Sequence, residues 1–176
     1  MTPESIIDTL IAYGAVVPAH EAFDFLFHGE FPDGRMALVL KEAEAEIRGL
    51  LSSPSEEDPN VSSRQQTMAL LRHFTLGGPM RPGRDYTTCD RKRGLWKWKT
   101  RTVRIAGMYL QGPHRFVIAH VGFARGLKRG GKAVLEREAA FAQVAAARLD
   151  TVGLLPHAWH TKDPHDGETA AFDPYR

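Results

Sequence analysis

Apolar and polar residues follow a helical period through the first half of the chain. Residues 3–12, 34–51 and 62–74 each place apolar side chains three or four positions apart, with polar or charged side chains between them. This spacing predicts three helices, of which the second is clearly amphipathic. Residues 20–27 are apolar and aromatic and fit either a helix or a strand, whereas the polar residues 52–60 predict a loop.

The hydrophobic period changes to two in the second half of the chain. Segments 95–102, 103–110 and 115–121 are rich in β-branched and aromatic residues and predict strands, after an extended connector at 80–90. Residues 132–149 are rich in strong helix formers and predict a closing helix. This order predicts an α+β fold, with N-terminal helices packed on a curved antiparallel sheet of three to four strands.

The predicted elements divide the chain into three parts. The length of 176 residues suits one domain with a usable core. We assign residues 31–150 to that domain and residues 1–30 to an N-terminal extension packed on it. Residues 151–176 are polar, contain three prolines and predict a tail.

Positive charge is concentrated in one stretch of the second half. Residues 91–132 hold 12 of the 23 Lys and Arg residues and no Asp or Glu. The rest of the chain has 11 basic residues against all 21 acidic ones, a net charge of −10. A cationic surface on an acidic body predicts a polyanionic partner. The alternative is a solvated basic face that binds nothing.

Several classes of protein are disfavoured by the sequence. No apolar run approaches the ~20 residues that cross a bilayer, and the start MTPESIIDTL lacks the features of a secretory signal. The single cysteine, Cys89, excludes an internal disulfide framework, and we expect it to be inert. The sequence therefore predicts a cytoplasmic protein with no membrane partner.

The period of two assigns side chains to opposite faces of the first strand. Lys97, Lys99 and Arg101 share one face, which we expect to be exposed to solvent. Trp96 and Trp98 share the other, which we expect to be buried against the helices. Cations neutralise phosphates and aromatic rings stack on bases, so this sheet suits single-stranded RNA. The expected RNA-binding residues are Arg91, Lys92, Arg101, Tyr109, Arg125, Lys128 and Arg129.

The same stretch holds residues able to cleave RNA without a metal. Such cleavage needs proton transfer to and from ribose oxygens, and cations that stabilise the charge on phosphorus. His120 titrates near neutrality and is the candidate acid or base, although a lone histidine at a strand end is more often structural. The candidate ligands of the scissile phosphate are Lys97, Lys99, Arg104, Arg125 and Lys128, and the first three join His120 as the predicted catalytic residues. The histidines of HAWHTKDPH lie in no predicted element, so we assign no metal and no cofactor.

Residues 64–148 resemble the RelE/ParE superfamily of toxins, in particular its HigB-like and phage-derived RelE-like branch. The shared pattern is Gly-Leu-Trp opening a strand at 94–96, an arginine on the next strand (Arg104), and a strand that ends His-x-Gly-Phe at 120–123. A basic loop containing Arg125 and an Ala-rich helix follow it. The preceding LLRHFTLGGPMRPGRDY is similar to the family's helix and connector.

The resemblance implies a helical hairpin on a curved antiparallel sheet and a toxin of a toxin–antitoxin pair. Most such toxins cleave mRNA without a metal, many within the ribosomal A site. The expected partners are therefore mRNA, free or on the ribosome, and a cognate antitoxin protein. The resemblance puts Arg104, His120 and Arg125 at the family's strand-arginine, late-strand and basic-loop positions.

Two other functions are also compatible with the sequence. A ParE-like toxin would inhibit DNA gyrase and have no nuclease chemistry. A phage or prophage protein would keep the basic surface only to bind nucleic acid. A small helix-turn-helix antitoxin encoded by the neighbouring gene would favour either toxin over the binding protein.

Overall fold

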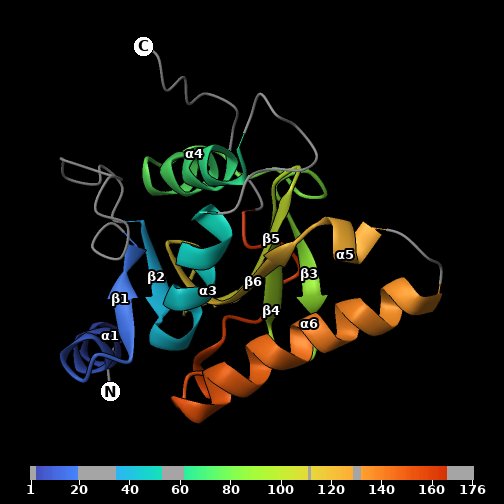
Figure 1. Cartoon of the computed structure of the whole chain (residues 1–176). Helices are drawn as coiled ribbons and strands as arrows, with labels where there is room; N and C mark the ends of the chain where they lie inside the picture. Colours follow the sequence, from blue (N-terminus) through green and yellow to red (C-terminus); the bar gives the residue numbers. More distant parts are fainter. Residues whose placement is uncertain (1–2, 20–34, 53–61, 111, 129–131, 166–176) are drawn as a thin grey trace.

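A six-stranded mixed sheet forms the centre of the protein (Figure 1). The computed structural model describes residues 3–19, 35–52, 62–110, 112–128 and 132–165. The sheet has the strand order β1-β2-β6-β5-β4-β3. Its strands are β1 (Val16–Pro18), β2 (Met36–Leu40), β3 (Tyr86–Asp90), β4 (Leu95–Lys99), β5 (Val103–Tyr109) and β6 (Arg115–Phe123).

The helices come mainly before and after the strands of the second half. They are α1 (Pro3–Ala12), α3 (Lys41–Ser52), α4 (Ser63–Thr75), the short α5 (Arg125–Lys128) and α6 (Lys132–Thr151), with a 3₁₀ turn at η1 (Leu155–His157). A capping box between Ser62 and Gln65 begins α4. In the described part of the chain, no helix is both long enough and apolar enough to cross a membrane.

The predicted α+β class is confirmed, but the sheet is larger than expected and is mixed. Strands β3 to β6 are antiparallel neighbours in chain order, as the sequence predicted for three of them. Strand β2 joins the other edge of β6 in parallel, and β1 pairs with β2 in antiparallel orientation. The described part of the N-terminal extension therefore adds an edge strand to the sheet.

The predicted helix at 34–51 is wrong in its first part. Met36–Leu40 is strand β2, and helix α3 begins only at Lys41. The last four residues of β2 are buried, and Leu38 pairs with Val117 in the middle of β6. A parallel strand that is covered on both faces reads as a continuous apolar run, which periodicity does not distinguish from a buried helix.

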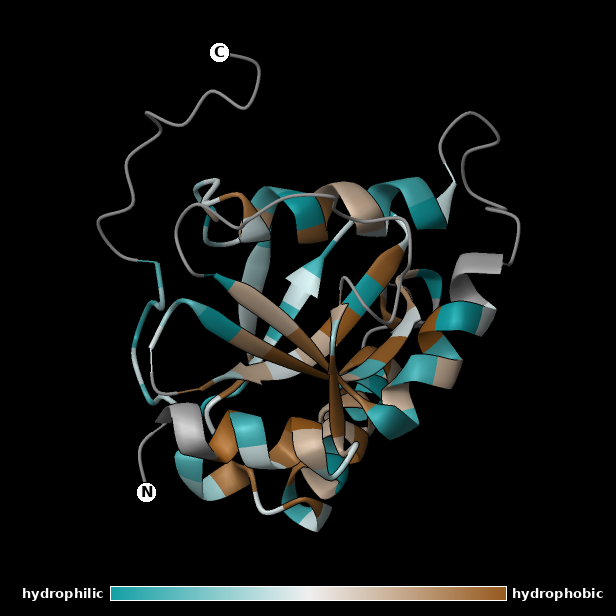
Figure 2. Ribbon diagram, turned by 90° about the vertical axis from the view of Figure 1, so that its left-hand side faces the viewer, coloured by the Kyte–Doolittle hydropathy of each residue, from teal (hydrophilic) through white to brown (hydrophobic). Residues whose placement is uncertain are grey.

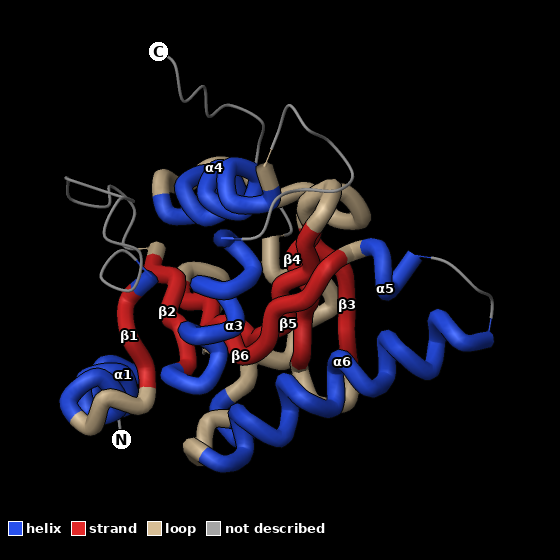
Figure 3. Tube along the Cα trace, in the orientation of Figure 1, coloured by secondary structure: helices blue, strands red, loops and turns tan. Residues whose placement is uncertain are grey.

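Helices cover both faces of the sheet. Glu46 of α3 and Phe141 of α6 both contact His120 of β6, so these two helices lie on the same face (Figure 3). Phe74 of α4 packs instead on Trp98, whose side chain points to the opposite face. Figure 2 shows the result, largely hydrophobic strands between helices that carry both hydrophilic and hydrophobic residues.

The aromatic core lies between α4 and the sheet. Trp98 is fully buried, stacked on Phe116 with ring centroids 4.0 Å apart and tilted against Phe74 at 4.6 Å. Its indole N–H donates to the hydroxyl of Tyr109 at 2.9 Å. Trp96 is 4% exposed. The predicted burial of both tryptophans is confirmed, but α3 and α6, which were also expected to cover them, lie on the opposite face of the sheet.

Residues after α6 form part of the core. Leu154 and Ala158 are buried, and the hydroxyl of Tyr109 lies 2.6 Å from Nε2 of His165. Asp163 accepts a hydrogen bond from the hydroxyl of Tyr86. The sequence predicted a polar tail here, yet residues 154–165 pack on the sheet because their polar side chains pair with buried hydroxyl groups.

Candidate functional site

The register of the sheet gathers the four predicted catalytic residues on one face. Lys97 of β4 lies opposite Ala106 of β5, which in turn lies opposite His120 of β6. Lys99 and Arg104 are opposite each other in the next row. Paired residues point to the same face, as do residues two apart along a strand. The structure therefore places Lys97, Lys99, Arg104 and His120 on one surface of the sheet.

His120 is held by charged residues from two helices. Its Nδ1 lies 2.8 Å from Oε2 of Glu46 in α3. Arg148 of α6 donates to the two carboxylate oxygens of Glu46 at 2.8 and 2.6 Å, and to the carbonyl of Ala119 at 3.1 Å. The imidazole also packs against the ring of Phe141, with centroids 4.7 Å apart. The orientation of the imidazole is therefore fixed on several sides.

The contact with Glu46 decides which imidazole nitrogen carries the proton. Burial opposes ionisation of Glu46, but the hydrogen bonds from Arg148 and His120 outweigh it and lower the pKa of the carboxyl. An ionised carboxylate only accepts, so Nδ1 of His120 donates and Nε2 of the neutral ring keeps its lone pair. Nε2 has no hydrogen-bond partner among the described residues. A histidine oriented in this way is arranged as a general base.

The lowered pKa of Glu46 predicts a loss of stability in acid. A carboxyl with a depressed folded-state pKa stabilises the fold above its unfolded value of ~4.3, and this contribution disappears as the pH falls through the folded value. We expect the free energy of unfolding to fall less steeply below pH ~5 in Glu46→Gln than in the wild type. Urea unfolding at several pH values checks this, with the exposed Glu136→Gln as matched control. Parallel pH profiles for wild type and Glu46→Gln would contradict it.

The expected exposure of Lys97 is wrong. Its side chain is 6% exposed and pairs with Glu138 of α6. Helix α6 crosses the face on which Lys97 lies, and a buried ammonium group requires such a partner. Lys97 is thus neutralised by its own chain, and we remove it from the candidate phosphate ligands.

Lys99 and Arg104 keep the properties expected of a cationic site. Burial lowers the pKa of Lys99, and repulsion by Arg104 and then Lys97 lowers it further. Arg104 donates to the carbonyl of Thr100, which holds its guanidinium beside the β4–β5 turn. Two adjacent cations with a lysine pKa below its usual range are typical of functional sites.

Helix α6 covers the centre of this face. A Cβ added at Gly122 would lie 3.2 Å from Cε2 of Phe141, so the phenyl ring lies directly over that glycine. The same ring packs on His120. Phe141 therefore limits the space above the sheet between His120 and Arg104, which are diagonal neighbours roughly 7–8 Å apart.

The predicted RNA-binding residues fall into two groups rather than on one continuous surface. Arg91 and Lys92 are in the β3–β4 turn, at one end of β4. Arg101 is in the turn at the other end, roughly 13 Å along the strand at ~3.3 Å per residue. Arg125 is near Arg101, because the amide of Ala124 donates to the carbonyl of Thr102 at 2.7 Å.

Three further predicted RNA-binding residues do not contribute to a described surface. Tyr109 is 0% exposed and bonded to Trp98 and His165, so its expected role in base stacking is wrong. Simple alternation along β5 puts Tyr109 on the core face, because Tyr109 shares the face of Ile105, which is opposite Trp98. Arg129 and the side chain of Lys128 lie outside the described residues.

Sequence reasoning missed the charged partners from the helices. Glu46 and Arg148 are 102 positions apart, and Lys97 and Glu138 are 41 apart. Each of these partners belongs to a helix whose polar face the sequence predicted, but its contact depends on how the helix crosses the sheet. Burial raises the pKa of the Cys89 thiol to about 11, which disfavours the reactive thiolate.

Comparisons with known proteins return no match. No protein-family model, no curated protein and no solved structure matches this chain. The function is therefore inferred from the α+β fold and from the residues on one face of its sheet. On that face an oriented histidine, His120, lies near the cationic pair Lys99 and Arg104.

Proposed function

We propose that this protein is a metal-independent endoribonuclease, acting as the toxin of a cytoplasmic toxin–antitoxin pair. The observation that supports the proposal most is the orientation of His120, whose Nδ1 is held by Glu46 while Nε2 has no described partner. The diagonal neighbour of His120 in the sheet is the cation Arg104. The resemblance to RelE/ParE toxins favours the same chemistry.

The cleavage step assigns one role to each of three residues. Nε2 of His120 takes the proton of a ribose 2′-hydroxyl, and the 2′-oxygen attacks the adjacent phosphorus. The bond from phosphorus to the 5′-oxygen breaks, which leaves a 2′,3′-cyclic phosphate and a 5′-hydroxyl end. Lys99, with its lowered pKa, donates a proton to the departing oxygen. Arg104 stabilises the charge that develops on the phosphoryl oxygens.

Cleavage by the purified protein tests this function. We expect RNA incubated with the protein to be cut in the presence of EDTA, because no step uses a metal, and to carry 2′,3′-cyclic phosphate ends. Induction in bacteria should arrest growth with cut mRNA, and co-expression of the cognate antitoxin should relieve it. Growth arrest with intact mRNA and failed DNA supercoiling would move the protein to the gyrase-inhibiting class.

A second function, nucleic-acid binding without cleavage, is favoured by a different observation. Phe141 covers Gly122 and packs on His120, and Glu138 neutralises Lys97. If the protein only binds nucleic acid, α6 is a fixed layer of the fold. Only the basic residues at the ends of the sheet then contact the nucleic-acid strand. Salt-sensitive binding with no cleavage in any buffer would support this function over the nuclease.

Both functions predict RNA binding that weakens with salt. Each phosphate contact to a single strand contributes about −0.7 to the slope of log K against log salt concentration. Replacing Arg101 and Arg125 together by alanine should therefore make the slope less steep by roughly 1.4. Fluorescence anisotropy with a labelled oligonucleotide at several KCl concentrations measures it, with the distant Lys41→Ala as control. An unchanged slope would exclude this end of the sheet from the binding surface.

A further inference from the structure

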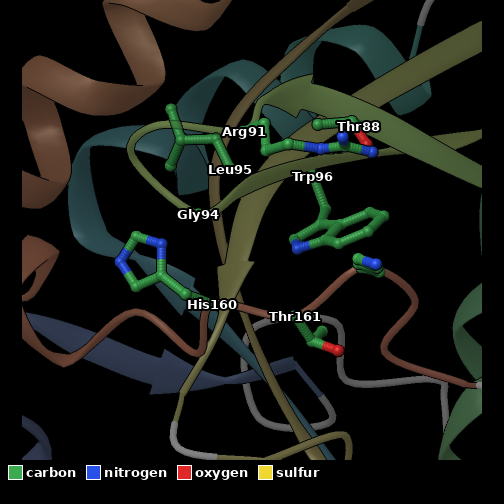
Figure 4. A pocket seen from close by; sticks show the side chains of 8 residues that line it. Thr88, Arg91, Gly94, Leu95, Trp96, His160 and Thr161 are labelled. Atoms are coloured by element: carbon green, nitrogen blue, oxygen red, sulfur yellow. The ribbon is translucent and has the colours of Figure 1, made fainter.

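A cavity of about 250 Å³ opens between the β3–β4 turn and the segment after α6 (Figure 4). Arg91 and Thr88 line it from the strand side, and His160, Thr161 and Lys162 from the carboxyl-terminal side. No Asp or Glu is among the described residues that form it. The polar side chains at this cavity can therefore all donate hydrogen bonds, and Arg91 and Lys162 are cations, an environment that favours an anion.

Trp96 contributes a buried donor to the cavity. Its side chain is almost fully buried, yet its indole N–H has no hydrogen-bond partner among the described residues, whereas the N–H of Trp98 donates to Tyr109. Figure 4 shows the nitrogen of Trp96 on the edge of the ring that faces His160 and Thr161. An indole N–H can only donate, so this group is available to an acceptor that enters the cavity.

The two walls of the cavity are fixed by close packing at Gly94. This residue has φ +67°, and a Cβ added to it would lie 2.9 Å from Cβ of Ala158 and 3.2 Å from Cε1 of His160. The amide of Trp159 also donates to the carbonyl of Tyr109 at 2.8 Å. The cavity is therefore formed by the fold itself and not by a chance gap between two loops.

We propose that this cavity binds the phosphate group of a single nucleotide. Arg91 and Lys162 neutralise the phosphate, and the indole N–H of Trp96 and the hydroxyl of Thr161 donate to its oxygens. The volume is below the ~300–1,000 Å³ of pockets that enclose drug-sized ligands. It suits one nucleotide rather than a dinucleotide cofactor. The phosphate belongs either to a free nucleoside monophosphate or to the 5′ end of a strand.

This site goes beyond the proposed cleavage function. Trp96 and Lys97 are consecutive on β4, so their side chains point to opposite faces of the sheet. The cavity therefore does not include His120, Lys99 or Arg104. Nucleotide binding here is expected whether or not the protein cleaves RNA, and its failure is separate from the failure of cleavage.

The indole resonances of the full-length protein provide the test. In ¹H–¹⁵N spectra we expect uridine 5′-monophosphate to shift the Nε1–H signal of Trp96 and leave that of Trp98 in place; Trp96→Phe assigns the signal. Arg91→Ala and Lys162→Ala should each weaken binding roughly tenfold or more, as expected for a lost charge-assisted hydrogen bond. Lys132→Ala, which removes an exposed charge on α6, is the matched control. Thermal unfolding confirms that each variant is folded.

A comparison of several ligands decides whether the cavity binds a nucleotide phosphate. Binding of the monophosphate but not of uridine supports the site. Short RNAs with and without a 5′-phosphate then separate the two sources of the phosphate. Tighter binding of the 5′-phosphorylated RNA assigns the site to strand ends. If the 5′-phosphorylated RNA does not bind, the site is assigned to free nucleotides. Equal affinity for uridine and its monophosphate would overturn the proposal. The proposal would also be overturned if the monophosphate did not bind, or if inorganic phosphate bound equally well. Undiminished binding of the monophosphate by both Arg91→Ala and Lys162→Ala would overturn it too.

Discussion

His120→Ala is expected to lower the rate of RNA cleavage by roughly 10²–10⁴-fold, the range for loss of a positioned acid or base. The substitution removes the nitrogen that takes the 2′-hydroxyl proton, while Arg104 still stabilises the phosphoryl charge and Lys99 still protonates the departing oxygen. We therefore expect kcat to fall and KM to change little. Steady-state cleavage of a defined RNA in EDTA measures both constants.

Two further variants separate catalysis from structural damage. Glu46→Gln keeps the shape of the side chain but weakens its hold on Nδ1 of His120, so kcat should fall by less and its pH profile should shift. His114→Ala removes an exposed imidazole, on the loop before β6, and should leave the rate unchanged. Equal rates for the wild type and a folded His120→Ala would rule out His120 as the base. The interpretation as a nucleic-acid-binding protein would then be preferred.

Trp98→Ala is expected to lower the free energy of unfolding by ~3–5 kcal/mol, the usual cost of removing a buried aromatic side chain. The indole is 0% exposed, stacks on Phe116 and packs on Phe74. Its loss also leaves the buried hydroxyl of Tyr109 without a donor. Domains of this kind have a total stability of only ~5–15 kcal/mol, so the variant should unfold at much lower urea concentration.

The control for this prediction is an aromatic residue on the surface. Tyr13 is 82% exposed, and Tyr13→Ala should change the stability by less than ~0.5 kcal/mol. Urea unfolding followed by circular dichroism measures both variants. A loss below ~1 kcal/mol for Trp98→Ala would mean that this part of the core tolerates a cavity, which is incompatible with the stacking described here.

The sequence by itself determined the class of the fold and the phase of strand β4. A period of two in LWKWK put Trp96 and Trp98 on one face and Lys97 and Lys99 on the other, because alternation is a property of any extended chain. The helices at 62–74 and 132–149 were also predicted to within two residues at each end. Local spacing was sufficient in each case, because polar and apolar side chains recur with the period of the element.

Only the tertiary structure decided which charged side chains are available. Lys97 points away from the tryptophans as predicted, yet α6 crosses that face and pairs it with Glu138. His120 obtains its orientation from Glu46 and Arg148, two residues that no local pattern connects to it. Strand β2 likewise depends on a parallel neighbour 79 positions away, as the pair Leu38 and Val117 shows. The physical reason is that burial and ion pairing depend on how elements cross in space, which spacing along the chain does not specify.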